Sequence, residues 1–134
     1  MSHTPTRDLV DFLNTNIASL TSGTNLYDSQ VRAPLTGVIP EDAVFVWATG
    51  GRAPERTMGE PDEVRRAIVH FRVRNQKNAT GLALAREIQD TVRASSITGY
   101  IDVSLLIPEP RALGQDADGR NFYGGEFEMT YVSD

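Results

Sequence analysis

Residues 64–74 (VRRAIVHFRVR) largely alternate between apolar and polar side chains. Successive side chains of a β-strand point to opposite faces of its sheet, so this pattern predicts a strand over residues 63–74 with one buried face. The apolar face carries Ala67, Val69, Phe71 and Val73, and the other face carries Arg66, Ile68, His70, Arg72 and Arg74. The role of the protein depends on what this cationic face meets.

Two segments place apolar residues at helical spacing, which predicts helices over residues 6–20 and 78–94. The two apolar stripes are Leu9, Phe12, Leu13, Ile17 and Leu20, and then Gly81, Leu84, Ala85, Ile88 and Val92. Thr6 and Asn78 stand where a side-chain oxygen caps the first turn of a helix. The Ser-Gly pair at residues 22–23 follows the first helix and is a stop signal.

Other segments contain the residue types of β-strands. They are residues 25–27, 43–48, 99–107 and 120–132. In the last of these, Tyr123, Phe127, Met129 and Tyr131 alternate with Glu126, Glu128 and Thr130. Pro108 and Pro110 end the strand before it, because proline cannot donate to a strand ladder. The run DADG at residues 116–119 predicts a tight turn between the two.

Long glycine- and proline-containing segments at residues 28–42 and 49–62 predict loops rather than helices or strands. The chain length of 134 residues fits one domain over residues 1–134. The order of elements predicts the α/β (α+β) class. We expect a mainly antiparallel sheet of about four strands packed against two helices.

The polar faces of the last two strands carry acidic and small polar side chains: Asp102, Ser104, Glu126 and Glu128. If these strands neighbour the cationic strand, its face is a solvated ladder of ion pairs, each contributing at most about 1 kcal/mol. Ile68, Tyr100 and Leu106 fall on the same faces and favour partial cover by a helix or by a second chain. The sequence leaves both interpretations open.

The chain has 13 Lys and Arg residues against 18 Asp and Glu residues, a formal charge of -5. This acidic balance argues against broad binding to a nucleic-acid backbone, which needs clustered cations. Cysteine is absent, so disulfides and thiolate metal sites are excluded. Neither a cationic start before an apolar run nor a stretch of about 20 apolar residues occurs, so we expect no signal peptide and no membrane-spanning helix.

The sequence contains no pattern typical of catalysis. His3 and His70 match no metal-binding spacing, and no serine lies in Gly-x-Ser-x-Gly. The run TGGR at residues 49–52 lacks the lysine of a phosphate-binding loop. In a calcium loop that began at residues 116–119, the closing glutamate would fall near Phe127. We therefore expect no enzymatic activity, no metal and no cofactor.

The run PRALGQDADGR at residues 110–120 and the order of elements carry a resemblance to a known family. Together with Tyr123 and the strand at residues 127–131, this run is similar to the tail terminator (tail-completion, minor capsid) proteins of long-tailed bacteriophages. In that family a Leu-Gly-x-Asp-x-x-Gly-Arg turn often precedes the closing strand, and an alternating basic strand precedes the second helix. By pattern, the resemblance covers nearly the whole chain.

The resemblance implies a structural virion protein that forms a homohexameric ring on the head-proximal end of the tail tube. Such a ring ends tube polymerisation and joins the tail to the head connector. The implied partners are other copies of the chain, the tail tube protein and the head connector or neck protein. Genomic DNA would pass through the lumen without specific binding, and no membrane is involved. The implied location is the virion tail, after assembly in the host cytoplasm.

A closed ring needs two unlike patches on each subunit. We expect the cationic face and the acidic loop segments to supply them. The candidate interface residues are Arg66, His70, Arg72, Arg74, Glu41, Asp42, Arg52, Arg56, Glu60, Asp62 and Glu63. An alternative from a different class is a small ligand-binding or enzymatic α/β domain that uses a cleft between the helices and the sheet.

Overall fold

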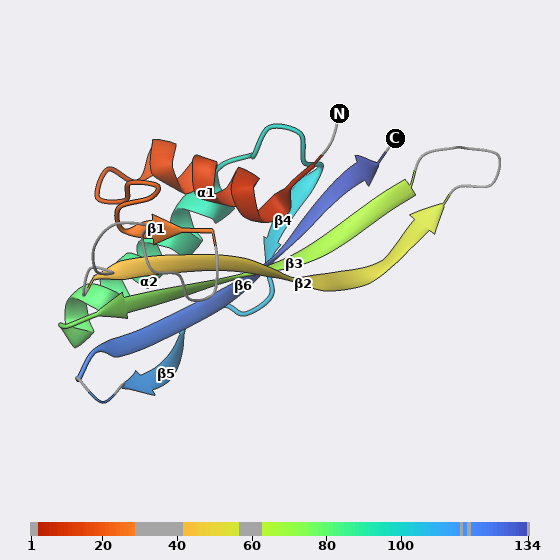
Figure 1. Ribbon diagram of the computed structural model, residues 1–134. Coiled ribbons are helices and arrows are strands. Elements are labelled where there is room, and N and C mark those ends of the chain that lie inside the picture. Colours follow the sequence, from red (N-terminus) through yellow and green to blue (C-terminus); the bar gives the residue numbers. More distant parts are fainter. Residues whose placement is uncertain (1–2, 29–41, 57–62, 116, 118, 134) are drawn as a thin grey trace.

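The computed structural model describes residues 3–28, 42–56, 63–115, 117 and 119–133, with the side chains of residues 52–56 and 133 outside the description. These residues form a small α+β domain with two helices and a mixed six-stranded sheet (Figure 1). The elements are α1 (Pro5–Asn16), β1 (Leu26–Tyr27), β2 (Ala43–Arg56), β3 (Glu63–Asn75), α2 (Asn78–Ala94), β4 (Asp102–Leu105), β5 (Arg111–Gln115) and β6 (Asn121–Ser133).

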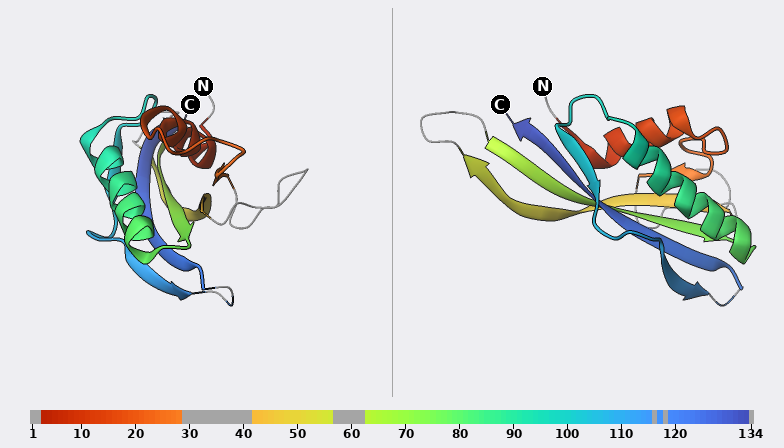
Figure 2. Two further views of the ribbon diagram at one scale, coloured as in Figure 1. Left: turned by 90° about the vertical axis from the view of Figure 1, so that its left-hand side faces the viewer. Right: turned by 180° about the vertical axis from the view of Figure 1, so that it is seen from behind.

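The sheet has the strand order β1-β2-β3-β6-β4, and β5 pairs with the half of β6 that β4 does not use. The β1–β2 pair is parallel, and the other described pairs are antiparallel. Both helices lie on one face of the sheet (Figure 2). The expected count of about four strands is therefore too low, and the mainly antiparallel pairing is confirmed. None of the described helices is both long and apolar enough to cross a bilayer.

The main core lies between the two helices and the sheet. The apolar face predicted for β3 is confirmed at Val69, Phe71 and Val73, which are buried, whereas Ala67 is half-buried. The rings of Phe71 and Phe127 stack with centroids 5.4 Å apart. The helices and the neighbouring strands cover them with Leu9, Leu13, Ala85, Ile88, Val44, Val46 and Met129.

Helix α1 is shorter than its apolar stripe predicts, because it ends at Asn16 rather than at Leu20. It begins at Pro5, which suits a first turn because proline lacks the N–H that would have no acceptor there. The predicted cap, Thr6, consequently lies inside the helix. Ile17 leaves the helix with extended φ and ψ angles, yet Ile17 and Leu20 are only 3% exposed. The end of the stripe is thus buried from a turn, in which the Leu20 N–H donates to the Ile17 carbonyl oxygen at 3.1 Å.

Helix α2 has the predicted bounds, Asn78–Ala94, but its predicted cap is wrong. Lys77 occupies the N-cap position, and its backbone N–H donates to Asn75 Oδ1 at 2.9 Å. The side-chain oxygen of Asn78 instead accepts a hydrogen bond from the Tyr123 hydroxyl. This contact fixes the start of α2 onto β6. The predicted stripe is buried at Gly81, Ala85, Ile88 and Val92, while Leu84 is half-buried.

Strand β2 continues to Arg56, so the loop predicted over residues 49–62 is wrong in its first half. Gly50 and Gly51 have φ angles of 81° and 146° where the pairing with β3 shifts register. Glycine tolerates such angles, so the strand bulges here instead of ending. Residues 57–62 and most of the loop predicted over residues 28–42 lie outside the described residues.

The region between α2 and β6 also differs from the prediction. Strand β4 covers only Asp102–Leu105 of the predicted residues 99–107, and Ile101, just before it, is 64% exposed. Strand β5 was not predicted, because the proline-rich segment before it indicated only a turn. Pro110 directly precedes β5, a position that needs no strand partner for its nitrogen.

Tyr100 joins the segment before β4 to helix α1, because its hydroxyl donates to Asp8 Oδ2 at 2.5 Å. Burial, together with this carboxylate, raises the pKa of Tyr100 well above its usual range. The unfolded chain therefore releases this proton above about pH 10, while the folded protein keeps it. The stabilisation is present below about pH 10 and is lost as the pH rises further.

We expect Tyr100→Phe to lower the free energy of unfolding by about 2 kcal/mol at pH 8, the typical value for a hydrogen bond to a charged group. The difference between the two proteins should shrink as the pH rises beyond 10. Denaturant unfolding at pH 8 and pH 11 measures both quantities. A gap of equal size at the two pH values would contradict this assignment.

Candidate assembly interface

The face of the sheet opposite α1 and α2, here called the outer face, carries the cationic residues of β3. In the observed register Phe45 pairs with Arg72, Trp47 pairs with His70, and His70 also pairs with Glu126. Residues directly opposite one another on adjacent strands share a face of the sheet. The register therefore places aromatic residues of β2 and acidic residues of β6 on either side of the cationic residues predicted from the sequence.

Arg72 lies at the centre of this face between aromatic rings. Its guanidinium carbon is 5.3 Å from the ring centroid of Phe45, 5.7 Å from that of Trp47 and 5.2 Å from that of Phe122. The guanidinium carbon of Arg74 lies 5.6 Å from the Phe45 ring. Burial lowers the pKa of the Arg72 guanidinium from its usual value. The aromatic rings hold this cation in one place, which the alternation of residues in β3 could not predict.

His70 is fixed on three sides. Its ring stacks on Trp47 with centroids 5.3 Å apart and planes 9° apart. One ring nitrogen, Nε2, lies 2.7 Å from Thr49 Oγ1, and the other, Nδ1, lies 3.4 Å from Glu126 Oε1. These contacts use both nitrogens and hold the imidazole ring in one orientation on the outer face.

The predicted ladder of opposite charges is present between β3 and β6. Arg66 Nε lies 3.8 Å from Glu128 Oε1, and both side chains are partly exposed. Ser104 of β4 pairs with Glu128 on the other side, and Asp102 pairs with Thr130. The ion-pair interpretation is thus confirmed on this part of the face, whereas cover by a second chain stays a prediction. One end of the outer face is an ion-pair ladder, and the other is a cation held by aromatic rings.

The predicted acidic patches are only partly described. Asp42 lies just before β2, where Oδ1 accepts a hydrogen bond from the Gln76 backbone N–H at 3.1 Å. Glu63, the first residue of β3, forms an ion pair with Arg65 at 3.0 Å. The backbones of Arg52 and Arg56 lie in β2 opposite Arg66 and Glu63, whereas their side chains, and Glu41, Glu60 and Asp62, lie outside the described residues. Of the acidic candidates only Asp42 and Glu63 lie in the described part of the chain, and the contacts named here join them to Gln76 and Arg65.

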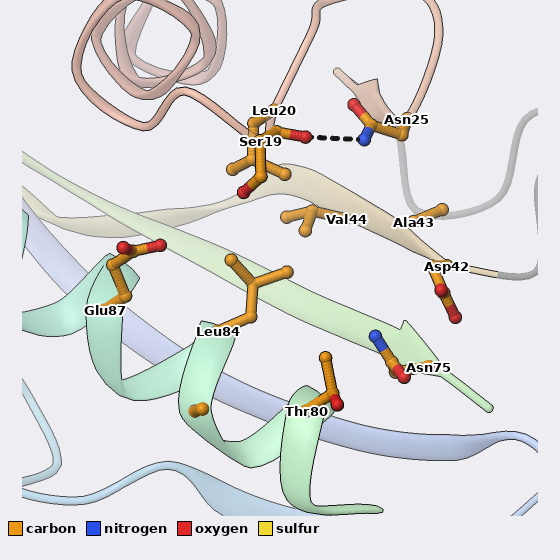
Figure 3. A pocket seen from close by; sticks show the side chains of 11 residues that line it. Ser19, Leu20, Asn25, Asp42, Ala43, Val44, Asn75, Thr80, Leu84 and Glu87 are labelled. Carbon is orange, nitrogen blue, oxygen red and sulfur yellow. Dashed lines mark hydrogen bonds between the residues drawn. The ribbon is translucent and has the colours of Figure 1, made fainter. Parts of the chain in front are cut away.

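A second feature, which sequence reasoning missed, is a cavity of about 420 Å³ on the helix side of the sheet, here called the α2 pocket. It lies where the end of β3, the start of β2 and the segment after α1 meet α2 (Figure 3). Its lining comes from separate parts of the chain, none of which has a distinctive motif. The lining residues are Ser19, Leu20, Asn25, Asp42, Ala43, Val44, Asn75, Thr80, Ala83, Leu84 and Glu87.

The α2 pocket combines an apolar floor with acidic groups. Leu20, Val44 and Leu84 supply the carbon surface, and Asp42 and Glu87 supply carboxylates (Figure 3). Asn25 closes one side, where its Nδ2 donates to the Ser19 backbone oxygen at 2.8 Å. The lining residues include no histidine, lysine or arginine, so the pocket itself provides no cationic group to polarise a substrate.

Metal binding and catalysis find no further support in the described part of the chain. No three His, Cys, Asp or Glu side chains gather there in an arrangement that suits a metal ion. Comparison with protein-family models and with curated proteins gives no match to this chain. The outer face and the α2 pocket are therefore the two surfaces of the described residues that bear on function.

Proposed function

We propose that this protein is a structural subunit of the tail terminator type, which assembles into a ring that caps the head-proximal end of a phage tail tube. The observation that carries the proposal is the outer face, where Arg72 is held among three aromatic rings. Arginine and tryptophan dominate the energetic centres of protein interfaces. Side chains that are already ordered also lose little conformational entropy on binding.

In this proposal the ring ends polymerisation of the tube and joins the tail to the head connector. The partners are other copies of the chain, six in the ring, together with the tail tube protein and the connector or neck protein. DNA passes through the lumen without specific binding, since the formal charge of -5 disfavours binding to the phosphate backbone. The protein would assemble in the host cytoplasm and remain in the tail of the virion, without enzymatic activity.

The α2 pocket is the observation that favours the second candidate, a small ligand-binding domain. Its volume of about 420 Å³ falls within the usual range of about 300–1,000 Å³ for ligand sites. A ligand-binding protein would remain a monomer or dimer, and a metabolite would raise its melting temperature. A ring subunit would instead show a mass six times that of the 14.7 kDa chain.

Reversal of a charge on the outer face is expected to prevent ring formation. Arg72 packs on three rings, so its replacement would also disturb the fold. Arg74 packs on one ring and is therefore the better position for the charge reversal. We expect Arg74→Glu to remain folded and to lose the ring mass in analytical ultracentrifugation. Arg93→Glu is the matched control, because Arg93 is exposed on α2 and pairs only with Asp90 among the interactions seen there. This control should assemble as the wild type does.

Two results would count against the proposal at different levels. Rings of Arg74→Glu that equal those of the wild type would remove the outer face from the interface. A wild-type chain that stays monomeric at every concentration, and also in the presence of its tail tube protein, would reject the assembly function itself.

A further inference from the structure

We infer that the α2 pocket of one copy receives the edge strand β5 of the next copy, with Arg111 and Leu113 as the inserted side chains. This inference rests on the proposed ring-forming function and names one of its contacts. It is drawn from the groups in the pocket that lack partners and from the matching groups on β5.

Asn75 shows that the pocket is built to receive a hydrogen-bond acceptor. The residue is only 3% exposed, and its Oδ1 is occupied by the backbone N–H of Lys77 at 2.9 Å. This bond fixes the amide orientation, so Nδ2 points into the pocket (Figure 3). Nδ2 donates to none of the described residues. Nδ2 is not fully enclosed by protein atoms, so it remains open at the pocket surface to an acceptor on an incoming chain.

The pocket is also lined by the carboxylates of Asp42 and Glu87, which would attract a cation placed beside that acceptor. Glu87 is exposed at the rim and forms no ion pair or hydrogen bond within the described part of the chain. Asp42 uses Oδ1 for the Gln76 N–H, and its second oxygen is available on the other side. An occupant that carries a cation, a carbonyl oxygen and an apolar group matches all of these features. A peptide segment with an arginine and a leucine has this composition.

Strand β5 offers these groups at the opposite edge of the sheet. Arg111 is exposed and forms no ion pair or hydrogen bond with the described residues. Leu113 is 49% exposed, although it packs partly over Gly124. Among the described strands β5 has β6 as its sole neighbour, so its other edge presents backbone carbonyl oxygens that no described strand uses. One of these oxygens could accept from Asn75 Nδ2.

The two surfaces lie apart on the same subunit, which makes the contact head-to-tail. The pocket is lined by the start of β2, beside β1 at one edge of the sheet, and β5 lies beyond β6 towards the other edge (Figure 1). A contact between unlike patches is heterologous and produces a closed ring when the rotation per subunit permits. A second copy is therefore the occupant that suits both the charges and the topology.

Cross-linking of single-cysteine variants tests this contact directly, because the natural chain has no cysteine. We expect a mixture of Ala83→Cys, inside the pocket, and Leu113→Cys, on β5, to form disulfide-linked dimers under mild oxidation. Each variant alone should not. Ala94→Cys, exposed at the far end of α2, replaces Ala83→Cys in the control mixture and should give no dimer.

Exchange of the charges supplies a second measurement. We expect Glu87→Arg and Arg111→Glu each to weaken assembly at least tenfold by ultracentrifugation, and the double variant to recover most of the loss. Both positions are exposed, so the monomer should keep its melting temperature.

The outcomes separate the two proposals. Wild-type rings without a dimer from Ala83→Cys and Leu113→Cys, or with equal dimers in the control, would overturn the contact and leave the ring function intact. A wild type that never assembles would overturn both. Rings, the specific dimer and recovery in the charge-exchanged variant together would support the contact.

Discussion

Phe71→Ala is expected to lower the free energy of unfolding by about 4 kcal/mol, in the range typical of large-to-small changes in a core. Phe71 is 1% exposed in the middle of the central strand β3, and its ring stacks on Phe127. Removal of the ring leaves a cavity beneath both helices, because neighbouring side chains fill such space only in part. Chemical denaturation gives the value, and Ile101→Ala, at a position 64% exposed, should change it by less than about 0.5 kcal/mol.

The effect of Phe71 can be assigned to one contact by a double-mutant cycle with Gly125. A Cβ atom at Gly125 would lie 2.5 Å from Phe71 Cε1 and 2.8 Å from Cζ, and 2.9 Å from Gln89 Nε2. Gly125→Ala should therefore destabilise the natural protein and be nearly neutral, or stabilising, once Phe71 is alanine. Residues in contact couple by about 0.5–3 kcal/mol in such cycles. An equal cost of Gly125→Ala in both backgrounds would show that the ring does not lie over Gly125.

The same strand shows why part of the fold is readable in the sequence. The alternation in residues 64–74 predicts β3 and its buried face, because a one-residue slip would expose Val69, Phe71 and Val73 together. The bounds of α2 are readable for a similar reason, since its stripe at Gly81, Ala85, Ile88 and Val92 is continuous. Periodicity is reliable where one element buries one whole face.

Other features depend on tertiary contacts that no local pattern contains. Gly50 and Gly51 are typical of a loop, yet pairing with β3 keeps them within a bulged strand. The stripe of α1 continues to Leu20 although the helix does not. Short strands such as β5 have too few residues to show a period, and β6 supplies their partner.

The candidate site illustrates the same limit. The cationic residues of the outer face could be predicted from β3 alone, but the rings of Phe45, Trp47 and Phe122 around Arg72 depend on strand register. The α2 pocket draws on residues from Ser19 to Glu87 and has no sequence signature. The hydrogen-bond donor that Asn75 presents to the pocket, Nδ2, can be identified only once the bond from the Lys77 N–H to Oδ1 is known.

Gly51→Ala is expected to weaken the pairing of β2 with β3 beyond the bulge, over residues 51–56 and 63–67, here called the distal arm. A Cβ atom at Gly51 would lie 2.0 Å from the backbone oxygen of Arg66, and the φ angle of 146° is one that other residues rarely adopt. The added Cβ is fixed to the backbone of β2 and meets a backbone oxygen of β3. No side-chain rotation can relieve this clash, so β2 must move away from β3. We expect the arm to lose at least about 3 kcal/mol of local stability from strain and lost pairing.

Hydrogen exchange of backbone amides measures this loss position by position. Protection should fall for the pairs beyond the bulge, such as Arg52 with Arg66, and persist for Val46 with Phe71 beneath the helices. Gly50→Ala is the matched control, because its φ of 81° is also positive while no atom lies within 4 Å of the added Cβ. It should cost only the strain of about 1–2 kcal/mol that a left-handed residue carries. Equal losses in the two variants would mean that the arm tolerates the clash and that strain alone sets the cost.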